Sequence, residues 1–458
     1  MSVHSSDTII ALSTGASPAA IAVVRLSGSE AIAKTQLLWR GKPLGEQISH
    51  TLHLGWIYTL DNQVLDEVVI GIFKGPNSFT KEDVIEISCH GSPFIVQKII
   101  REFLKIGVRY AEAGEFTKRA FLNGRFDLVQ AEAVADVIAA ETEAAHQAAL
   151  YQMRGGFSET IKDLRQQLIH FASLIELELD FGEEDVEFAN RQDLMDTVEH
   201  IQLVIKRLLE SFTLGNVVKN GVPTVIAGKP NAGKSTLLNA LLNEEKAIVS
   251  EIAGTTRDVI EDQISINGLI FRFIDTAGLR ETQDVVEKIG VQRSYEKIKG
   301  ASLMLYVLDL QQVQTVQAYE RELLEAQSFN IPFLMVANKA EFCSNALRAI
   351  LTQAEAHVLI SAKAKQGIDT VKDLIINKVQ NNQFKVNDPL LTNIRHHESL
   401  SQTLWALESV QRGLKSGLTG DFLAMDIRIA LQALASITGE VSVEDLLANI
   451  FSRFCIGK

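Results

Sequence analysis

The stretch GKPNAGKS, residues 228–235, constrains the fold of this chain more than any other feature. It matches the pattern G-x-x-x-x-G-K-[ST], follows the apolar run GVPTVIAG and precedes STLLNALLN, which has helical spacing. A strand, a glycine-rich loop and a helix in this order predict a phosphate-binding loop, because backbone N–H groups then surround a phosphate at the helix N-terminus. We expect Lys234 to neutralise phosphate charge and Ser235 to bind Mg²⁺. A turn that binds nothing is the alternative, which the flanking strand and helix disfavour.

Three later motifs indicate which nucleotide the site binds. DTAG (275–278), NKAE (338–341) and SAK (361–363) each follow a predicted strand. The order GxxxxGKS, GTTRD, DTAG, NKxE, SAK resembles the translation-factor-related GTPases, and this resemblance implies guanine recognition. Glu341 departs from it, since these GTPases usually carry Asp there; the added methylene changes the geometry but keeps the charge. The residues expected to bind GTP are Asn231, Ala232, Gly233, Lys234, Ser235, Thr236, Ser250, Thr255, Thr256, Asp275, Thr276, Ala277, Gly278, Asn338, Lys339, Glu341, Ser361, Ala362 and Lys363.

Hydrolysis needs a group that orients water, and Leu279 cannot do so where Ras-like proteins have Gln. The stretch DTAGLRETQDVVEKIG (275–290) resembles switch II of the tRNA-modification GTPases called MnmE or TrmE. That resemblance implies that Glu287 aligns the catalytic water; a solvated helix residue is the alternative.

The same family resemblance implies a potassium site. Asn231, Ser250, Ile252 and Thr255 match the positions that bind K⁺, and Thr256 joins Ser235 at Mg²⁺. A cation there offsets charge between the β- and γ-phosphates. Arg257 as an arginine finger in cis is the rival interpretation.

Resemblance to this family extends along essentially the whole chain. GEFTKRAFLNGRFDLVQAEAVADVI (114–138), PNSFTKEDVIEISCHG (76–91) and the tail FCIGK (454–458) resemble three further blocks of the family. They imply an N-terminal domain that dimerises and holds a one-carbon-substituted tetrahydrofolate, as the 5,10-methylene or 5-formyl form. The positions matching the folate contacts are Arg25, Glu86, Arg125 and Lys458. Each alone would more often be an ordinary surface charge, and His90 fits a structural histidine better than a proton shuttle.

The tail is expected to be held in place, not free. VSVEDLL (441–447) predicts a helix with Ser442 as N-cap and Val441 and Leu446 as a hydrophobic staple. Such a helix delivers Cys455 and Lys458 to a defined place. Cys455 is interpreted either as a nucleophile or redox-sensitive thiol, hence a catalytic candidate, or as a small packing residue.

Changes of pattern divide the chain. Residues 1–123 read as an α+β domain with strands at 20–28, 66–75 and 83–91 and one helix at 92–107. Residues 124–216 and 379–458 carry helical stripes, and 217–378 alternates strands with helices. We therefore predict a multidomain α/β plus all-α fold, in which a P-loop GTPase domain is inserted into a helical bundle and preceded by a folate-binding-like domain.

The composition indicates the cellular compartment of the protein and limits the kinds of partner it binds. Hydrophobic residues make up 46% and charged residues 22% of the chain, and no apolar run approaches the roughly 18 residues needed to span a bilayer. Three scattered cysteines fit a reducing cytoplasm and exclude a disulfide framework. The net charge of −13 indicates that any grip on RNA comes from a local patch or a partner.

The resemblance implies a potassium-activated GTPase acting on tRNA. As a homodimer with an MnmG-type, FAD-containing partner, it would add an aminomethyl or carboxymethylaminomethyl group to the wobble uridine of certain tRNAs. Two rivals stay open: a GTPase switch in RNA or ribosome assembly without modification chemistry, and a scaffold whose folate domain only dimerises.

Overall fold

The computed structural model describes residues 7–180, 191–244, 262–274, 301–353, 356–380, 390–441, 444–452 and 454–457. The chain forms two compact units. The first combines residues 1–139, 149–205 and 398–458, and the second combines 140–148 and 206–397. Because the first unit resumes after the second ends, the second is an insertion, which agrees with the predicted fold class. The four domain boundaries stay a prediction.

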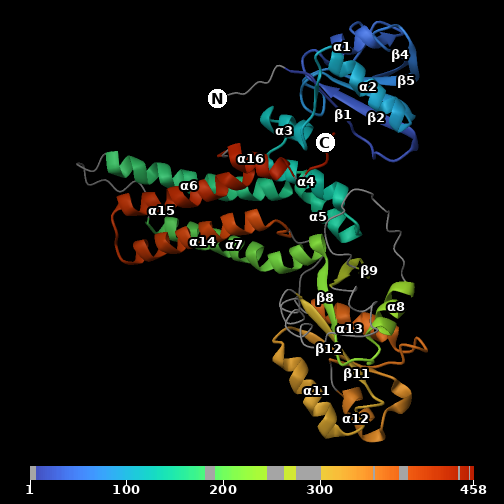
Figure 1. Ribbon diagram of the computed structural model, residues 1–458. Coiled ribbons are helices and arrows are strands. Elements are labelled where there is room, and N and C mark those ends of the chain that lie inside the picture. Colours follow the sequence, from blue (N-terminus) through green and yellow to red (C-terminus); the bar gives the residue numbers. More distant parts are fainter. Residues whose placement is uncertain are drawn as a thin grey trace. The chain divides into compact units, whose positions relative to one another are not determined.

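A seven-stranded sheet forms the N-terminal part of the first unit, with strand order β3-β4-β5-β6-β2-β1-β7; strands β1, β2, β4 and β5 are labelled in Figure 1. All neighbours are antiparallel except β1 and β7, which are parallel. The strands are β1 (Ile9–Leu12), β2 (Ala19–Ser27), β3 (Trp39–Arg40), β4 (Thr51–Tyr58), β5 (Val64–Phe73), β6 (Val84–Gly91) and β7 (Arg109–Tyr110). The three strands predicted in this region are therefore present as β2, β5 and β6.

Two helices cover one face of this sheet, α1 (Ala31–Leu38) and α2 (Pro93–Lys105). Ile99 and Phe103 of α2 are buried with the inward side chains Ile85 and Ile87 of β6. The sequence predicted α2 but missed α1. Its buried side chains are small or widely spaced over eight residues, so its apolar stripe is weak.

Long helices form the rest of the first unit. In α6 (Gly156–Asp180) the predicted stripe is buried, including Ile161, Leu168 and Ile175. α6 packs beside α15 (Gly420–Thr438), although the whole inserted unit separates them in sequence (Figure 1). The other helices in this region are α3 (Glu115–Leu122), α4 (Leu128–Ala139), α5 (Glu143–Met153), α7 (Arg191–Asn220), α14 (Ile394–Lys415) and α16 (Glu444–Phe451); α5, α7 and α14 each run across a boundary between the units. Within the described ranges, no helix combines the length and apolar character that crossing a bilayer requires.

The second unit contains a six-stranded sheet of order β13-β12-β11-β8-β10-β9. Its strands are parallel except for the β9–β10 hairpin. They are β8 (Val222–Ala227), β9 (Asp262–Ile266), β10 (Leu269–Phe273), β11 (Leu303–Asp309), β12 (Phe333–Asn338) and β13 (His357–Leu359). The helices are α8 (Lys234–Glu244), α11 (Val316–Ser328), α12 (Asn345–Gln353) and α13 (Ile368–Gln380), with a short 3₁₀ turn, η1 (Ala340–Phe342).

Both faces of this second sheet are buried. Along β11, Leu305 and Val307 belong to one core while Tyr306 and Leu308 belong to the core on the opposite face. A parallel sheet buried on both faces is the usual arrangement of α/β proteins. Its crevice at the carboxyl ends of the strands is where such folds bind ligands.

Candidate functional site

The predicted strand–loop–helix unit is present: β8 ends at Ala227 and α8 begins at Lys234. The loop between them passes close to β11. A Cβ built on Gly228, which has φ +134°, would lie 2.3 Å from the carbonyl oxygen of Val307. Only glycine fits this approach, so the first position of the motif is dictated by the neighbouring strand.

Two further loop residues adopt left-handed conformations, Asn231 with φ +63° and Gly233 with φ +98°. Asn is among the non-glycine residues that tolerate this region. Asn231 is exposed, whereas its neighbour Ala232 is buried. The loop thus presents the Asn231 carboxamide outward, at the position where the sequence predicted a potassium ligand.

The Lys234 side chain folds back onto the phosphate loop. Its Nζ donates to the carbonyl oxygens of Gly228 at 2.7 Å and Lys229 at 2.9 Å. Burial lowers the pKa of Lys234, since desolvation disfavours its charged form. The ammonium lies among backbone carbonyls at the helix start, beside Ser235 and Thr236, which begin α8 with it.

Asn338 joins three of the predicted motifs. Its Nδ2 donates to the carbonyl oxygen of Ala232 at 2.9 Å, and its Oδ1 accepts from the backbone N–H groups of Lys339 at 2.8 Å and Ala362 at 3.0 Å. The side chain is buried, so these bonds fix the phosphate loop, NKAE and SAK against one another.

Asp309 was missed by the sequence reasoning. It ends β11, is 5% exposed, and its Oδ2 lies 2.6 Å from Nζ of Lys339, a residue held at φ +64°. The available signal was an acidic residue at the carboxyl end of an apolar strand. Ser361 is buried and exchanges backbone hydrogen bonds with Gln366, whereas Glu341 is exposed on η1.

Many predicted nucleotide and ion positions lie outside the described residues, and their placement stays a prediction. This set contains Ser250, Ile252, Thr255, Thr256, Arg257, Asp275, Thr276, Ala277, Gly278 and Glu287.

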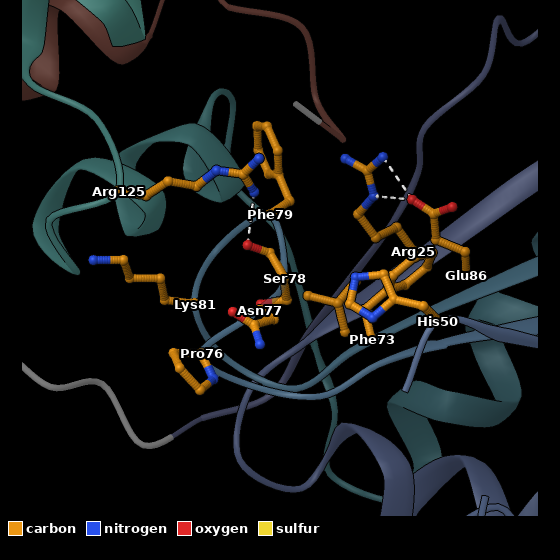
Figure 2. A pocket seen from close by; sticks show the side chains of 11 residues that line it. Arg25, His50, Phe73, Pro76, Asn77, Ser78, Phe79, Lys81, Glu86 and Arg125 are labelled. Atoms are coloured by element: carbon orange, nitrogen blue, oxygen red, sulfur yellow. Dashed lines mark hydrogen bonds and ion pairs between the residues drawn. The ribbon is translucent and has the colours of Figure 1, made fainter. Parts of the chain in front are cut away.

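A second site lies on the N-terminal sheet, as a cavity of about 550 Å³ (Figure 2). Its lining combines several cations, one carboxylate and two phenylalanine rings. The lining residues are Arg25, His50, Phe73, Pro76, Asn77, Ser78, Phe79, Lys81, Val84, Glu86 and Arg125. Three of the four predicted folate residues, Arg25, Glu86 and Arg125, therefore line one cavity.

Arg25 and Glu86 face each other across β2 and β6. Nε and Nη2 of Arg25 lie 3.0 Å and 2.8 Å from the same oxygen, Oε1 of Glu86. Both contacts end on the same carboxylate oxygen, Oε1. Figure 2 shows the pair at one end of the lining.

Phe79 lies near both arginines of the cavity. Its ring centroid is 5.4 Å from Cζ of Arg25 and 5.1 Å from Cζ of Arg125, within cation–π range. Arg125 also donates from Nη1 to the carbonyl oxygen of Ser78 at 2.6 Å (Figure 2). Burial lowers the pKa of Arg125.

The C-terminal segment contacts Arg25, one of the residues that line the cavity. The carbonyl oxygen of Gly457 accepts from Oγ of Ser13 at 3.2 Å and, at 3.5 Å, from Nη1 of Arg25. Gly457 has φ +96°, and a Cβ there would lie 2.1 Å from the carbonyl oxygen of Leu12. The tail is thus held against β1, while Lys458 and the predicted N-cap Ser442 lie outside the described residues.

Cys455 and His90 have distinct surroundings. Cys455 is exposed, which is not the environment of the packing residue that the sequence allowed. His90 does not line the cavity. Its Nδ1 lies 2.7 Å from Oδ1 of Asp66, and Oδ2 of the same carboxylate accepts from the His90 backbone N–H. This contact agrees with the interpretation of His90 as structural.

Comparison with known families matches nearly the whole chain. The family model for the MnmE helical domain matches residues 128–455, and the model for the GTP-binding protein TrmE N-terminus matches residues 8–125. Curated proteins named tRNA modification GTPase MnmE are similar over 99% of this chain. That of Cytophaga hutchinsonii is 54% identical, with 98% of its length covered, and that of Flavobacterium johnsoniae is 50% identical, with 99% covered. Among solved structures, the FeoB G-domain of Methanococcus jannaschii is 22% identical, covering 35% of this chain and 98% of that one, with a TM-score of 0.25.

Proposed function

This chain belongs to the MnmE family of tRNA modification GTPases, and from that premise we propose that it hydrolyses GTP while a carbon unit is added to the wobble uridine of certain tRNAs. The added group is aminomethyl or carboxymethylaminomethyl, a one-carbon tetrahydrofolate is its carbon source, and an MnmG-type flavoprotein supplies the redox step. The observation that carries the proposal is that Arg25, Glu86 and Arg125 line one cavity, while Arg25 also contacts the Gly457 carbonyl of the C-terminal segment.

The cavity's donors and acceptors suit a folate. The Glu86 carboxylate suits an amino-pyrimidinone edge such as that of a pterin, and the cations Arg125 and Lys458 suit the carboxylates of a glutamate tail. Phe79 offers a ring face of the kind that pairs with aromatic groups. When bound, the folate supplies the carbon at a reactive oxidation level; the chain's residues hold and orient it.

In the second unit the residues suit guanine nucleotide with Mg²⁺ and K⁺. Lys234 lies at the helix start to neutralise phosphate charge, and hydroxyls of Ser235 and Thr256 suit a hard cation. The exposed Asn231 carboxamide suits K⁺, with Ser250, Ile252 and Thr255 as further ligands. Glu287 orients the attacking water. Bound cations supply charge that stabilises the transition state.

An uncovered apolar surface supports a homodimer. Leu52, Leu54 and Trp56, alternating along β4, are 72%, 68% and 42% exposed, and Ile21 on β2 is 64% exposed. By alternation Ile21 lies on the same sheet face as Arg25. An exposed apolar patch of this kind indicates a protein interface. We therefore place the dimer contact on the same sheet face as Arg25.

Wobble nucleosides test the proposal. In cytoplasmic tRNA from cells lacking this chain, mass spectrometry is expected to show loss of the modified uridines, and the wild-type chain to restore them. Arg25→Ala is expected not to restore them. Arg101→Ala is the matched control, because Arg101 is exposed on α2, outside the cavity. Unchanged modification in the deletion strain would contradict the proposal.

A further inference from the structure

The loop of residues 76–82 forms one wall of the cavity. Residues 76–79 and Lys81 line the cavity, whereas Thr80 and Glu82 do not. Thr80 is fully buried, and the Glu82 side chain is 22% exposed. The two residues that do not line the cavity, Thr80 and Glu82, are therefore placed to contact the protein behind the loop.

A chain of polar contacts behind the wall begins at β2. Oγ of Ser27 lies 2.7 Å from Oε2 of Glu82, to which it donates, and 2.6 Å from Oγ1 of Thr80. Ser27 is two residues beyond Arg25 on the same strand, so the wall is fastened to the strand that supplies the cavity arginine.

Helix α3 completes this set of contacts. Nη1 of Arg119 lies 3.3 Å from both carboxylate oxygens of Glu82, and Nη2 of Arg119 lies 3.0 Å from Oε1 of Glu115 and 2.8 Å from Oδ1 of Asp7. The Arg119 side chain is only 6% exposed. A buried arginine that bridges three carboxylates is satisfied in one geometry, so it fixes where Glu82 lies.

The end of α3 holds the loop at two further points. Nδ2 of Asn123 donates to the Thr80 carbonyl oxygen at 2.6 Å, and Nζ of Lys81 donates to the Gly124 carbonyl oxygen at 2.8 Å. Glu115, Arg119 and Asn123 recur every four residues, so they lie on one helix stripe. This stripe belongs to the GEFTKRAFLNGR block that the sequence singled out.

From these contacts we infer that Glu82 and Thr80, which do not touch the ligand, are positioning residues that hold Phe79 and Ser78 in place and so set the affinity of the cavity. Arg119 and Ser27 fix them from behind. The inference deepens the proposed folate site and rests on it for the ligand class, whereas the placement of the loop itself does not depend on the ligand.

The test uses the full chain and 5-formyltetrahydrofolate, titrated calorimetrically well below the unfolding temperature. Glu82→Gln is expected to raise Kd about tenfold, the effect of losing one charge-assisted hydrogen bond. Glu30→Gln is the matched control, since Glu30 forms an exposed ion pair with Lys34 and lies outside the cavity lining. Hydrolysis of GTP without folate is expected to stay unchanged in both variants.

A pair of substitutions at Thr80 separates positioning from packing. Thr80→Val keeps the shape and removes the hydroxyl, whereas Thr80→Ser keeps the hydroxyl and removes a methyl group. Positioning through the Ser27–Glu82 contacts predicts weaker folate binding in Thr80→Val and near wild-type binding in Thr80→Ser. The opposite order would assign Thr80 a packing role and overturn the inference.

Hydrogen exchange measures how readily the loop of residues 76–82 opens in the absence of ligand. In Glu82→Gln and Thr80→Val, the amides of residues 77–82 are expected to exchange about tenfold faster than in the wild type, reflecting local opening. If the wild-type chain binds no folate, the proposed cofactor is wrong and this measurement alone decides the inference. Wild-type exchange rates in both variants would overturn it.

Discussion

Lys229 of the phosphate loop is ion-paired with Glu322, a carboxylate buried on α11 that also accepts from Oη of Tyr306 at 3.1 Å. Burial raises the pKa of Tyr306, so its hydroxyl stays protonated and donates. The ion pair with Glu322 raises the pKa of Lys229. The loop is thus attached to the helix that follows β11, at a residue which the G-x-x-x-x-G-K-[ST] pattern leaves unspecified.

Lys229→Ala is expected to destabilise the second unit by about 1–2 kcal/mol. The cost is below that of breaking a fully buried pair because Lys229 is half exposed and Tyr306 still donates. Lys229→Arg keeps the charge and is expected to restore most of the stability. The tryptophans, Trp39, Trp56 and Trp405, all lie in the first unit, so calorimetry should detect the change and tryptophan fluorescence should not.

Gly457→Ala is expected to displace the tail, because the new Cβ would meet the Leu12 carbonyl and φ +96° disfavours alanine. Folate affinity should fall about tenfold or more, with GTP hydrolysis unchanged. Gly417→Ala is the control: Gly417 has φ +70° and open space around its Cβ position. Equal folate affinities in the two variants would show that the tail contact does not matter for binding.

Alkylation at pH 8 is expected to modify Cys455 and spare Cys89. Burial, with a contribution from Asp66, raises the pKa of the Cys89 thiol to about 11, so little thiolate is present. Cys455 is exposed. Peptide mapping after brief iodoacetamide treatment measures both sites. Faster labelling of Cys89 would contradict the burial argument.

At acidic pH, Glu115 should no longer contribute to the stability of the folded state. Burial acts to raise the pKa of Glu115, but hydrogen bonds from Arg109, the Glu112 backbone and Arg119 lower it below its ordinary value of 4.5. Because the pKa of Glu115 is lower in the folded state, its ionised form stabilises the fold above about pH 4.5. This stabilisation is lost as the pH falls through the folded-state pKa. Glu115→Gln should therefore cost about 1–3 kcal/mol at pH 7 and progressively less below pH 4. Urea unfolding followed by tryptophan fluorescence measures this difference.

Hydrolysis of GTP is expected to be faster in K⁺ than in Na⁺, since Na⁺ draws its ligands into a tighter shell. Asn231→Gly tests the potassium ligand better than alanine does, because glycine accepts φ +63° without strain. It should lose the potassium response and keep nucleotide affinity, while Arg257→Ala should keep the response. Equal wild-type rates in the two salts would exclude the potassium mechanism.

Local patterns predicted the elements, and long-range contacts completed the sites. The spacing of Ile161 and Leu168 predicts α6, and GKPNAGKS predicts the loop, because each signal lies within one element. By contrast, the Asn338 link to Ala362 and the Gly457 approach to Leu12 join segments that the sequence does not pair. The polar stripe of α3 was identified only as part of a block that resembles the family, since its partner Glu82 lies on a distant loop.

The packing of α6 against α15 has a consequence for how the chain is made. The apolar stripe of α6 leaves the ribosome before its partner exists, and all of residues 206–397 are synthesised in between. At about 5–20 residues per second, the stripe stays without α15 for an interval on the order of tens of seconds. Nascent chains halted between these helices should therefore recruit chaperones that bind exposed apolar helices, and release them once residues 420–438 emerge.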